Sequence, residues 1–304
     1  MADPLDAGTE TPADSDSPQG AFDRDTAVQE LERSIGEQQP AVVRFAAEVS
    51  PDWRAGRGPH GGYLAAMLLR ALVETVDEQS RAPRSLTIHY ARAPQPGPVT
   101  ISATIERAGR SLSTLSARME QQGKLIALAL GAFSVPWEAP SIAELPMPQV
   151  APQDPERAAG ELLFKGAPPF TRHLIVQPRI GAIPFTGADH PMEIGSWLGL
   201  AEPRAIDALS LAFFSDAMFS PPFIRLREPA TTPTIDLTIH FRKALAPASE
   251  RSDAEARAEL CFARFRSGLV QDGFFEEDGV IWAADGSVLA QSRQLGIVMP
   301  LPIG

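Results

Sequence analysis

Two stretches of the sequence, 151 residues apart, decide the fold. Leu86-Thr-Ile-His-Tyr-Ala-Arg-Ala93 is matched by Leu237-Thr-Ile-His-Phe-Arg-Lys-Ala244, and five of the eight positions are identical. The same offset places Ala65-Ala66-Met67 over Asp216-Ala217-Met218. One short match can arise by chance, but a second match at the same offset indicates that the chain contains an internal repeat.

Each half of the chain shows the same order of expected elements around its copy of the repeat. In the first half, the apolar residues of Gly61 to Val76 recur at helical spacing, and four short β runs separated by glycines follow. In the second half, Ala205 to Phe219 is apolar and helical in character, and four more β runs follow it. The pattern predicts an α+β protein in which each half contains one helix and an antiparallel meander.

Charge and composition exclude several classes of protein. With 27 Lys and Arg against 38 Asp and Glu, the net charge is −11, which disfavours binding to nucleic acid. The longest apolar stretch, Leu125 to Trp137, is too short to span a membrane. The N-terminus shows no signal-peptide pattern and the single cysteine, Cys261, fits a reducing compartment, so we expect a cytoplasmic protein. Nucleotide-binding motifs are absent and the five histidines are scattered, so neither a cofactor nor a metal is expected.

Acidic residues and prolines mark the expected domain boundaries. Residues 1–38 are expected to be an acidic, disordered tail, because the first twenty residues hold five acids and no Lys or Arg. The first domain is expected to span residues 39–137. A proline-rich, semi-rigid linker is expected over residues 138–167. Residues 168–304 then form the second domain, in which we place the active site.

Three polar residues of the second half lie over small or apolar residues of the first half. They are Asp216 over Ala65, Thr234 over Pro83 and, with a twelve-residue insertion, Gln294 over Gly131. A carboxylate in an apolar helix is costly unless it is hydrogen-bonded or has a task. A carboxylate, a hydroxyl and an amide can hold one water between them, with the carboxylate as general base. The alternative is a surface carboxylate, a turn threonine and an exposed strand glutamine.

The geometry of the strand sets one condition for this trio. Strict alternation along the strand places Thr234 on the face opposite to Leu237, Ile239 and Phe241. Thr234 can therefore approach Asp216 only if it precedes the regular strand or if a bulge intervenes.

Over roughly residues 40–300 the chain resembles the acyl-CoA thioesterase II (TesB-like) family. The matching stretches are Gly61-Gly62, Ser85 to Arg92, Ala132-Phe133, Phe214-Ser-Asp216, Pro233 to Asp236, His240-Phe-Arg242 and Gln294-Leu-Gly296. The resemblance implies two tandem hotdog domains, each an antiparallel sheet wrapped around a long helix, and a homodimer or larger homo-oligomer. It also implies hydrolysis of fatty acyl-CoA to free fatty acid and coenzyme A, with Asp216, Thr234 and Gln294 orienting the hydrolytic water. One departure is Tyr63, which follows the glycine pair where the family carries a glutamine.

Further residues are candidates for binding the substrate. The backbone N–H groups at Gly61 and Gly62 could polarise a thioester carbonyl, although the glycines could equally serve close packing of the helix. An acyl channel between helix and sheet would be lined by Phe213, Phe214, Met218 and Phe219. Five basic residues could meet the phosphates of coenzyme A or simply be solvated; they are Arg242, Lys243, Arg264, Arg266 and Arg293.

Two other functions remain open at this point. A protein that keeps the double-hotdog shell could bind acyl groups or acyl-CoA without catalysis. A hotdog dehydratase would need an acid–base pair, usually with a histidine near the helix, and the helix of the second half contains none.

Overall fold

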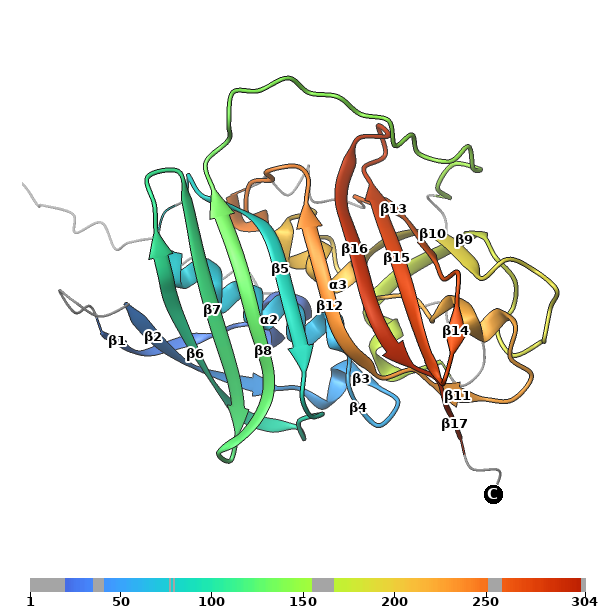
Figure 1. The fold of residues 1–304 in the computed structure, drawn as a ribbon, viewed down its shortest axis with the longest axis horizontal. Helices are drawn as coiled ribbons and strands as arrows, with labels where there is room; N and C mark the ends of the chain where they lie inside the picture. Colours follow the sequence, from blue (N-terminus) through green and yellow to red (C-terminus); the bar gives the residue numbers. More distant parts are fainter. Residues whose placement is uncertain are drawn as a thin grey trace, which may run out of the picture.

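An antiparallel sheet runs without interruption through both halves of the chain (Figure 1). The computed structural model describes residues 20–34, 41–76, 78, 80–154, 167–250 and 259–301. The first half contributes strands β1 (Gln29–Ser34), β2 (Val42–Val49), β5 (Ala82–Tyr90), β6 (Gly97–Ala108), β7 (Leu112–Gln121) and β8 (Lys124–Ser134). The second half contributes strands β9 (Leu174–Ile180), β10 (Glu193–Leu200), β12 (Thr234–Phe241), β13 (Cys261–Arg266), β14 (Val270–Gln271), β15 (Phe274–Trp282) and β16 (Val288–Ile297).

Short elements complete the described structure. Two separate two-stranded pairs are β3 (Arg54–Ala55) with β4 (Gly58–Pro59), and β11 (Ala230–Thr231) with β17 (Met299–Pro300). The α-helices are α1 (Ala21–Asp25), α2 (Gly61–Val76) and α3 (Ala208–Phe214). Single turns of 3-10 helix are η1 (Pro51–Trp53), η2 (Pro169–His173), η3 (Pro221–Ile224) and η4 (Ala248–Glu250).

The two copies of the repeat lie side by side at the centre of the sheet. The strand order is β1-β2-β6-β7-β8-β5-β12-β16-β15-β13-β10-β9, with β14 beside β15. Strands β5 and β12 are antiparallel, and Thr87 lies directly opposite Thr238 with their hydroxyl oxygens 3.1 Å apart. Because these threonines are equivalent in the repeat, a pseudo-two-fold axis passes between them. The internal repeat is therefore confirmed, and the pairing closes two sheet edges that would otherwise be open to aggregation.

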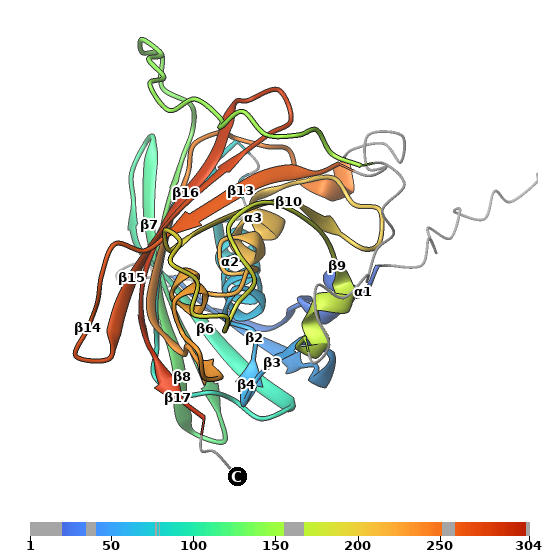
Figure 2. The ribbon, with the colours of Figure 1, turned by 90° about the vertical axis from the view of Figure 1, so that its right-hand side faces the viewer.

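The sheet curves around α2 and α3, which lie on its concave side (Figure 2). Ala65, Met67 and Leu68 of α2 are fully buried, as are Leu86 of β5 and Leu237 of β12. Alternate residues of the strands face the helices in one continuous core, because successive side chains of a strand point to opposite faces. The expected α+β class is confirmed.

The second helix is shorter than the predicted Ala205 to Phe219. Helix α3 begins after Asp207, whose carboxylate accepts a hydrogen bond from the Ser210 N–H at 2.9 Å and caps the first turn. The helix ends at Phe214, and Pro221-Pro222 follow shortly afterwards, where neither residue has an N–H to continue a helical ladder. Asp216 therefore lies in the turn after the helix and not in its middle.

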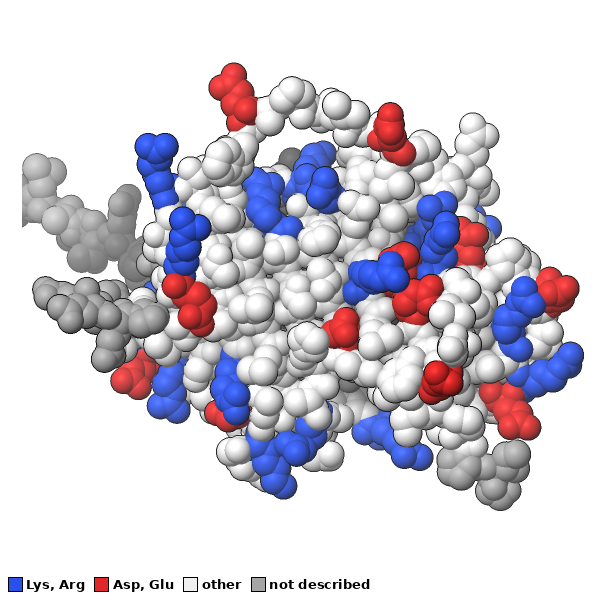
Figure 3. Space-filling model, in the orientation of Figure 1, with Lys and Arg blue, Asp and Glu red and all other residues white. Residues whose placement is uncertain are grey.

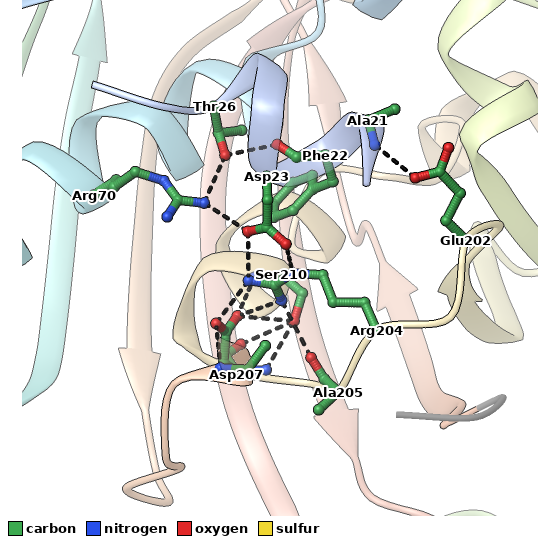
Figure 4. Close-up of polar contacts among 11 residues, drawn as sticks. Ala21, Phe22, Asp23, Thr26, Arg70, Glu202, Arg204, Ala205, Asp207 and Ser210 are labelled. Atoms are coloured by element: carbon green, nitrogen blue, oxygen red, sulfur yellow. Dashed lines mark hydrogen bonds and ion pairs between the residues drawn. The ribbon is translucent and has the colours of Figure 1, made fainter. Parts of the chain in front are cut away.

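The expected disordered tail, residues 1–38, contains ordered structure in its described part. Helix α1 is anchored by Phe22, which is 4% exposed, and by Asp23, which accepts hydrogen bonds from Arg70 and Arg204 (Figure 4). Strand β1 pairs with β2 and extends the first half of the sheet. The five acids on which the prediction rested lie among residues 1–19, outside the described residues, whereas Asp23 is paired with two arginines, one from each half. The other residues of the predicted tail lie outside the described residues.

The proline-rich linker covers one face of the second half. Its described part, 138–154, has no helix or strand, and it passes from β8 towards β9 (Figure 1). The Trp282 and Trp197 indoles donate hydrogen bonds to the carbonyl oxygens of Leu145 and Ala151, at 3.0 and 3.1 Å. Leu145, Met147 and Val150 pack on a cluster around these tryptophans that is separate from the main core. The segment is thus a packed strap rather than a free spacer. Among the described residues, no helix combines the length and apolarity that crossing a bilayer requires.

Candidate active site

Asp216 lies where the two halves meet. Its carboxylate Oδ2 accepts a hydrogen bond of 2.9 Å from the N–H of Gly62, at the start of α2 in the other half. The side chain is 16% exposed, so it is largely withdrawn from water. A helix N-terminus favours a negative charge, because its first N–H groups have no partner within the helix. The base of the predicted trio is therefore held by the first half of the chain.

The glycine pair allows this close approach. A Cβ atom on Gly61 would lie 2.7 Å from Asp216 Oδ2, and one on Gly62 would lie 2.4 Å from the carbonyl oxygen of Phe213. Both distances are shorter than any ordinary carbon–oxygen contact. The glycines thus serve close packing, and the Gly62 N–H predicted to face a thioester oxygen contacts Asp216 instead.

His60 completes the contacts of Asp216 from the side of α2. Its Nδ1 accepts a hydrogen bond from the Tyr63 N–H at 3.3 Å, so Nε2 carries the proton and donates to the backbone oxygen of Asp216 at 2.8 Å. Nε2 also lies 3.7 Å from the Asp216 carboxylate. Burial lowers the pKa of His60, and the neighbouring Asp216 opposes that shift. The sequence analysis did not connect His60 with Asp216, because 156 residues separate them.

Thr234 and Gln294 are brought together by an irregularity in the sheet. The pairing of β12 with β16 shifts register between Thr234 and Asp236, which meets the condition set by strand alternation. The Thr234 hydroxyl donates a hydrogen bond to Gln294 Oε1 at 2.8 Å. Gln294 lies opposite Leu237, a core residue, and is only 5% exposed. The predicted surface alternative for the glutamine is therefore wrong.

Glu277 is a polar residue of this site that the sequence analysis missed. Its Oε1 accepts a hydrogen bond of 2.6 Å from Gln294 Nε2, and the side chain is 5% exposed. Burial raises the pKa of Glu277 to about 8, and the charges of Asp216 and Asp278 add to the rise. A signal for it existed in the alternation of β15, where Phe275, Glu277 and Ile281 share the buried face.

The environment of Asp216 makes its carboxylate a stronger base than an exposed aspartate. Burial raises the pKa of Asp216 above its usual value of 3.8. The neighbouring His60, the N–H groups of Gly62 and Gly61 and the side chain of Gln294 oppose the rise without cancelling it. The charged form is thus held by donors while its basicity is increased, as a general base requires.

The four aromatic and methionine residues predicted to line an acyl channel divide into two groups. Phe213 and Phe214 are 0% and 1% exposed and belong to the core. Met218 and Phe219 are only partly buried. A cavity of about 240 Å³ lies elsewhere, against Phe22 of α1 and Arg204. Within the described ranges, no three His, Cys, Asp or Glu side chains gather as a metal site would require.

Comparisons with known proteins agree with this architecture. Residues 49–134 match the family model of the acyl-CoA thioesterase N-terminal domain, and residues 145–298 match that of the C-terminal domain. An uncharacterised protein of Mycobacterium tuberculosis is 24% identical over 284 residues, covering 85% of this chain and 92% of the relative.

Solved structures share the fold at low sequence identity. A hotdog-fold protein of unknown function from Alicyclobacillus acidocaldarius has a TM-score of 0.77 at 24% identity, covering 94% of this chain and 100% of that one. The acyl-CoA thioesterase II TesB2 of Mycobacterium marinum has a TM-score of 0.67 at 18% identity, covering 92% and 99%. The tandem hotdog fold and the TesB-like resemblance are thereby confirmed. With family models matched on both halves, the chain belongs to the acyl-CoA thioesterase family.

Proposed function

We propose that the protein hydrolyses fatty acyl-CoA to free fatty acid and coenzyme A, with Asp216 as the general base. The observation that carries the proposal is a largely buried carboxylate held by the Gly62 N–H at the meeting point of the two halves, in the half that also pairs the Gln294 amide with the Thr234 hydroxyl. Burial raises the pKa of this carboxylate, and the Gln294 side chain opposes the rise. Neither a nucleophilic side chain nor a cofactor is required for this chemistry.

The reaction can be written with these residues alone. Asp216 removes a proton from water, and the oxygen of that water bonds to the thioester carbonyl carbon. Thr234 and Gln294 direct the lone pair of the water. Collapse of the tetrahedral intermediate breaks the carbon–sulfur bond, and the coenzyme A sulfur receives the proton from Asp216. The carboxylate is regenerated and the fatty acid leaves.

The test compares the wild type with Asp216→Asn and with a matched control on the outer face of β12, Asp236→Asn. Release of free thiol is measured from acyl-CoAs of short, medium and long chain. Loss of the base should lower kcat by about 10²- to 10⁴-fold, whereas the control should keep its activity. Near-normal turnover by Asp216→Asn would show the mechanism to be wrong.

Two other functions are separated by the same experiment. Binding of acyl-CoA without turnover by the wild type would identify a non-catalytic acyl-binding protein. Hydration of an enoyl-CoA would indicate a dehydratase. The structure gives that reading little support, because both ring nitrogens of His60 are already hydrogen-bonded.

We also infer a homodimer or larger homo-oligomer located in the cytoplasm. The central part of the outer sheet face carries few charges (Figure 3). On β8, Leu128 and Leu130 are 43% and 56% exposed there. A face with few charges and exposed leucines fits a second copy of the chain better than open water. Cys261 is buried and unpaired, which fits a reducing compartment.

A further inference from the structure

Glu277 is a second buried carboxyl beside the proposed base, with no assigned role. It lies on β15 directly opposite Gln294 of β16, on the face that turns towards the helices. It accepts a hydrogen bond from Gln294 Nε2 at 2.6 Å. Burial of an acid costs folding free energy, so the presence of Glu277 here points to a task.

The first half of the chain shows that the fold does not need an acid at this position. Equivalent residues can be identified because the repeat places Leu86 over Leu237, and the strand register carries the match across the sheet. The equivalent rows are Leu237–Gln294–Glu277 in the second half and Leu86–Gly131–Leu115 in the first half. Leu115 is fully buried in the core. Glutamine and glutamate are thus both present in the half that carries Asp216, and both are absent from the other.

The Gln294 amide can be turned by 180°, which exchanges its oxygen and its nitrogen, and a hydrogen bond to Thr234 alone does not fix which of the two atoms faces the threonine. A hydroxyl can donate to an amide oxygen or accept from an amide nitrogen, so it tolerates either orientation. In the structure the Glu277 Oε1 accepts from Nε2, so that nitrogen lies towards β15 and Oε1 of Gln294 lies towards Thr234. The second N–H of the amide is then free to act on Asp216 or on a water beside it.

We propose that Glu277 is a positioning residue that holds the Gln294 amide in the orientation needed to direct the hydrolytic water. The inference rests on the proposed thioesterase function. Glu277 touches neither substrate nor water in this scheme and acts through Gln294.

Protonation of Glu277 adds a second consequence. The charged groups that act on it are Asp216 and Asp278, and both raise its pKa, which reaches about 8. Arg293 is directed to Asp278 on the outer face and does not neutralise Glu277. With a pKa of about 8, Glu277 is mostly protonated at neutral pH. Its ionisation at higher pH adds a negative charge to the site, which disfavours the negatively charged tetrahedral intermediate, and the rate should fall.

The experiment measures kcat and KM across pH for Glu277→Leu and Glu277→Gln. The matched control is Glu276→Leu, because Glu276 is the neighbouring acid whose side chain points away and accepts from the Gly268 N–H. Glu277→Leu should lower kcat at least about tenfold with little change in KM and without loss of stability. Glu277→Gln keeps a carbonyl acceptor for Gln294, so it should restore most of kcat and remove the alkaline decline.

Two outcomes would overturn the inference while leaving the proposed function standing. One is a Glu277→Leu protein with the kcat and pH profile of the wild type. The other is a loss of kcat that accompanies a lowered unfolding midpoint and is not restored by Glu277→Gln. If the wild type hydrolyses no acyl-CoA, the proposed function fails. The Gln294 side-chain amide signals in NMR then test the positioning itself, since they should shift as Glu277 titrates and stay constant in Glu277→Gln.

Discussion

The acid at position 277 should make the stability of the protein depend on pH in a specific direction. Its pKa is 4.5 in the unfolded chain and about 8 in the folded protein. Below the unfolded pKa both states are protonated, and Glu277 carries no penalty. As the pH rises above it, the unfolded chain ionises while the folded protein does not, so stability falls until the folded pKa is reached.

The size of this effect follows from the shift. At about 1.4 kcal/mol per pKa unit, the full penalty is about 5 kcal/mol above pH 8, and about 3 kcal/mol is already present at pH 7. Glu277→Gln cannot ionise and escapes the penalty. The variant should therefore resemble the wild type in stability near pH 4 and exceed it increasingly towards pH 8.

Urea unfolding of both proteins at several pH values measures the difference directly. Subtracting the wild type from the variant removes the contributions of groups that do not interact with Glu277. A difference that stays constant from pH 4 to 8 would refute the reasoning, because it would mean that Glu277 ionises equally in both states.

Three further variants test the fold around the site. Gly62→Ala should lower the stability measured in thermal unfolding by about 1 to 3 kcal/mol, because the new Cβ would meet the Phe213 carbonyl oxygen. This cost should exceed the gain of about 1 kcal/mol that alanine brings to a helix, and a gain in stability would contradict the reasoning. Arg204→Met should cost about 3 to 5 kcal/mol in urea unfolding, since it leaves the buried Asp207 carboxylate without its arginine; an unchanged midpoint would count against it. Leu130→Lys should weaken self-association in sedimentation velocity without changing monomer stability, and the inferred interface is wrong if the assembly is unaffected.

The tandem repeat of the fold could be predicted because the match between residues 86–93 and 237–244 defines which residues of the two halves are equivalent. The same offset that aligned the repeated strands appears in space as Thr87 against Thr238. It appears again where Gly62 approaches Phe213, at the crossing of the two helical segments. A duplicated fold places equivalent residues around one axis, so a single register recovered from the sequence determines which residues lie opposite each other at the centre.

What failed depended on contacts between distant segments. Helix α3 ends at Phe214, and Asp216 lies beyond it, where it contacts the glycine pair of the other half. The order of the described start of the chain depends on Asp23, whose charge is balanced by arginines 47 and 181 residues away. His60 and Asp216 are likewise far apart in the sequence, and only the folded structure brings them into contact. Neither helical periodicity nor local charge carries information about such partners.

The comparison of Glu277 with Leu115, its equivalent in the first half, gives one more test. If the acid is tolerated only because Gln294 lies opposite it, the same acid in the other half should not be tolerated. Leu115→Glu places a carboxyl opposite Gly131, which has no side chain to donate to it. The variant should lose several kcal/mol of stability in urea at neutral pH and recover part of it in acid, because a buried carboxyl costs least when protonated. Leu115→Met is the control and should cost less than about 1.5 kcal/mol. Equal stability of the two variants at neutral pH would mean that the sheet accepts a buried acid without a partner. In that case the pairing of Glu277 with Gln294 would need no functional explanation.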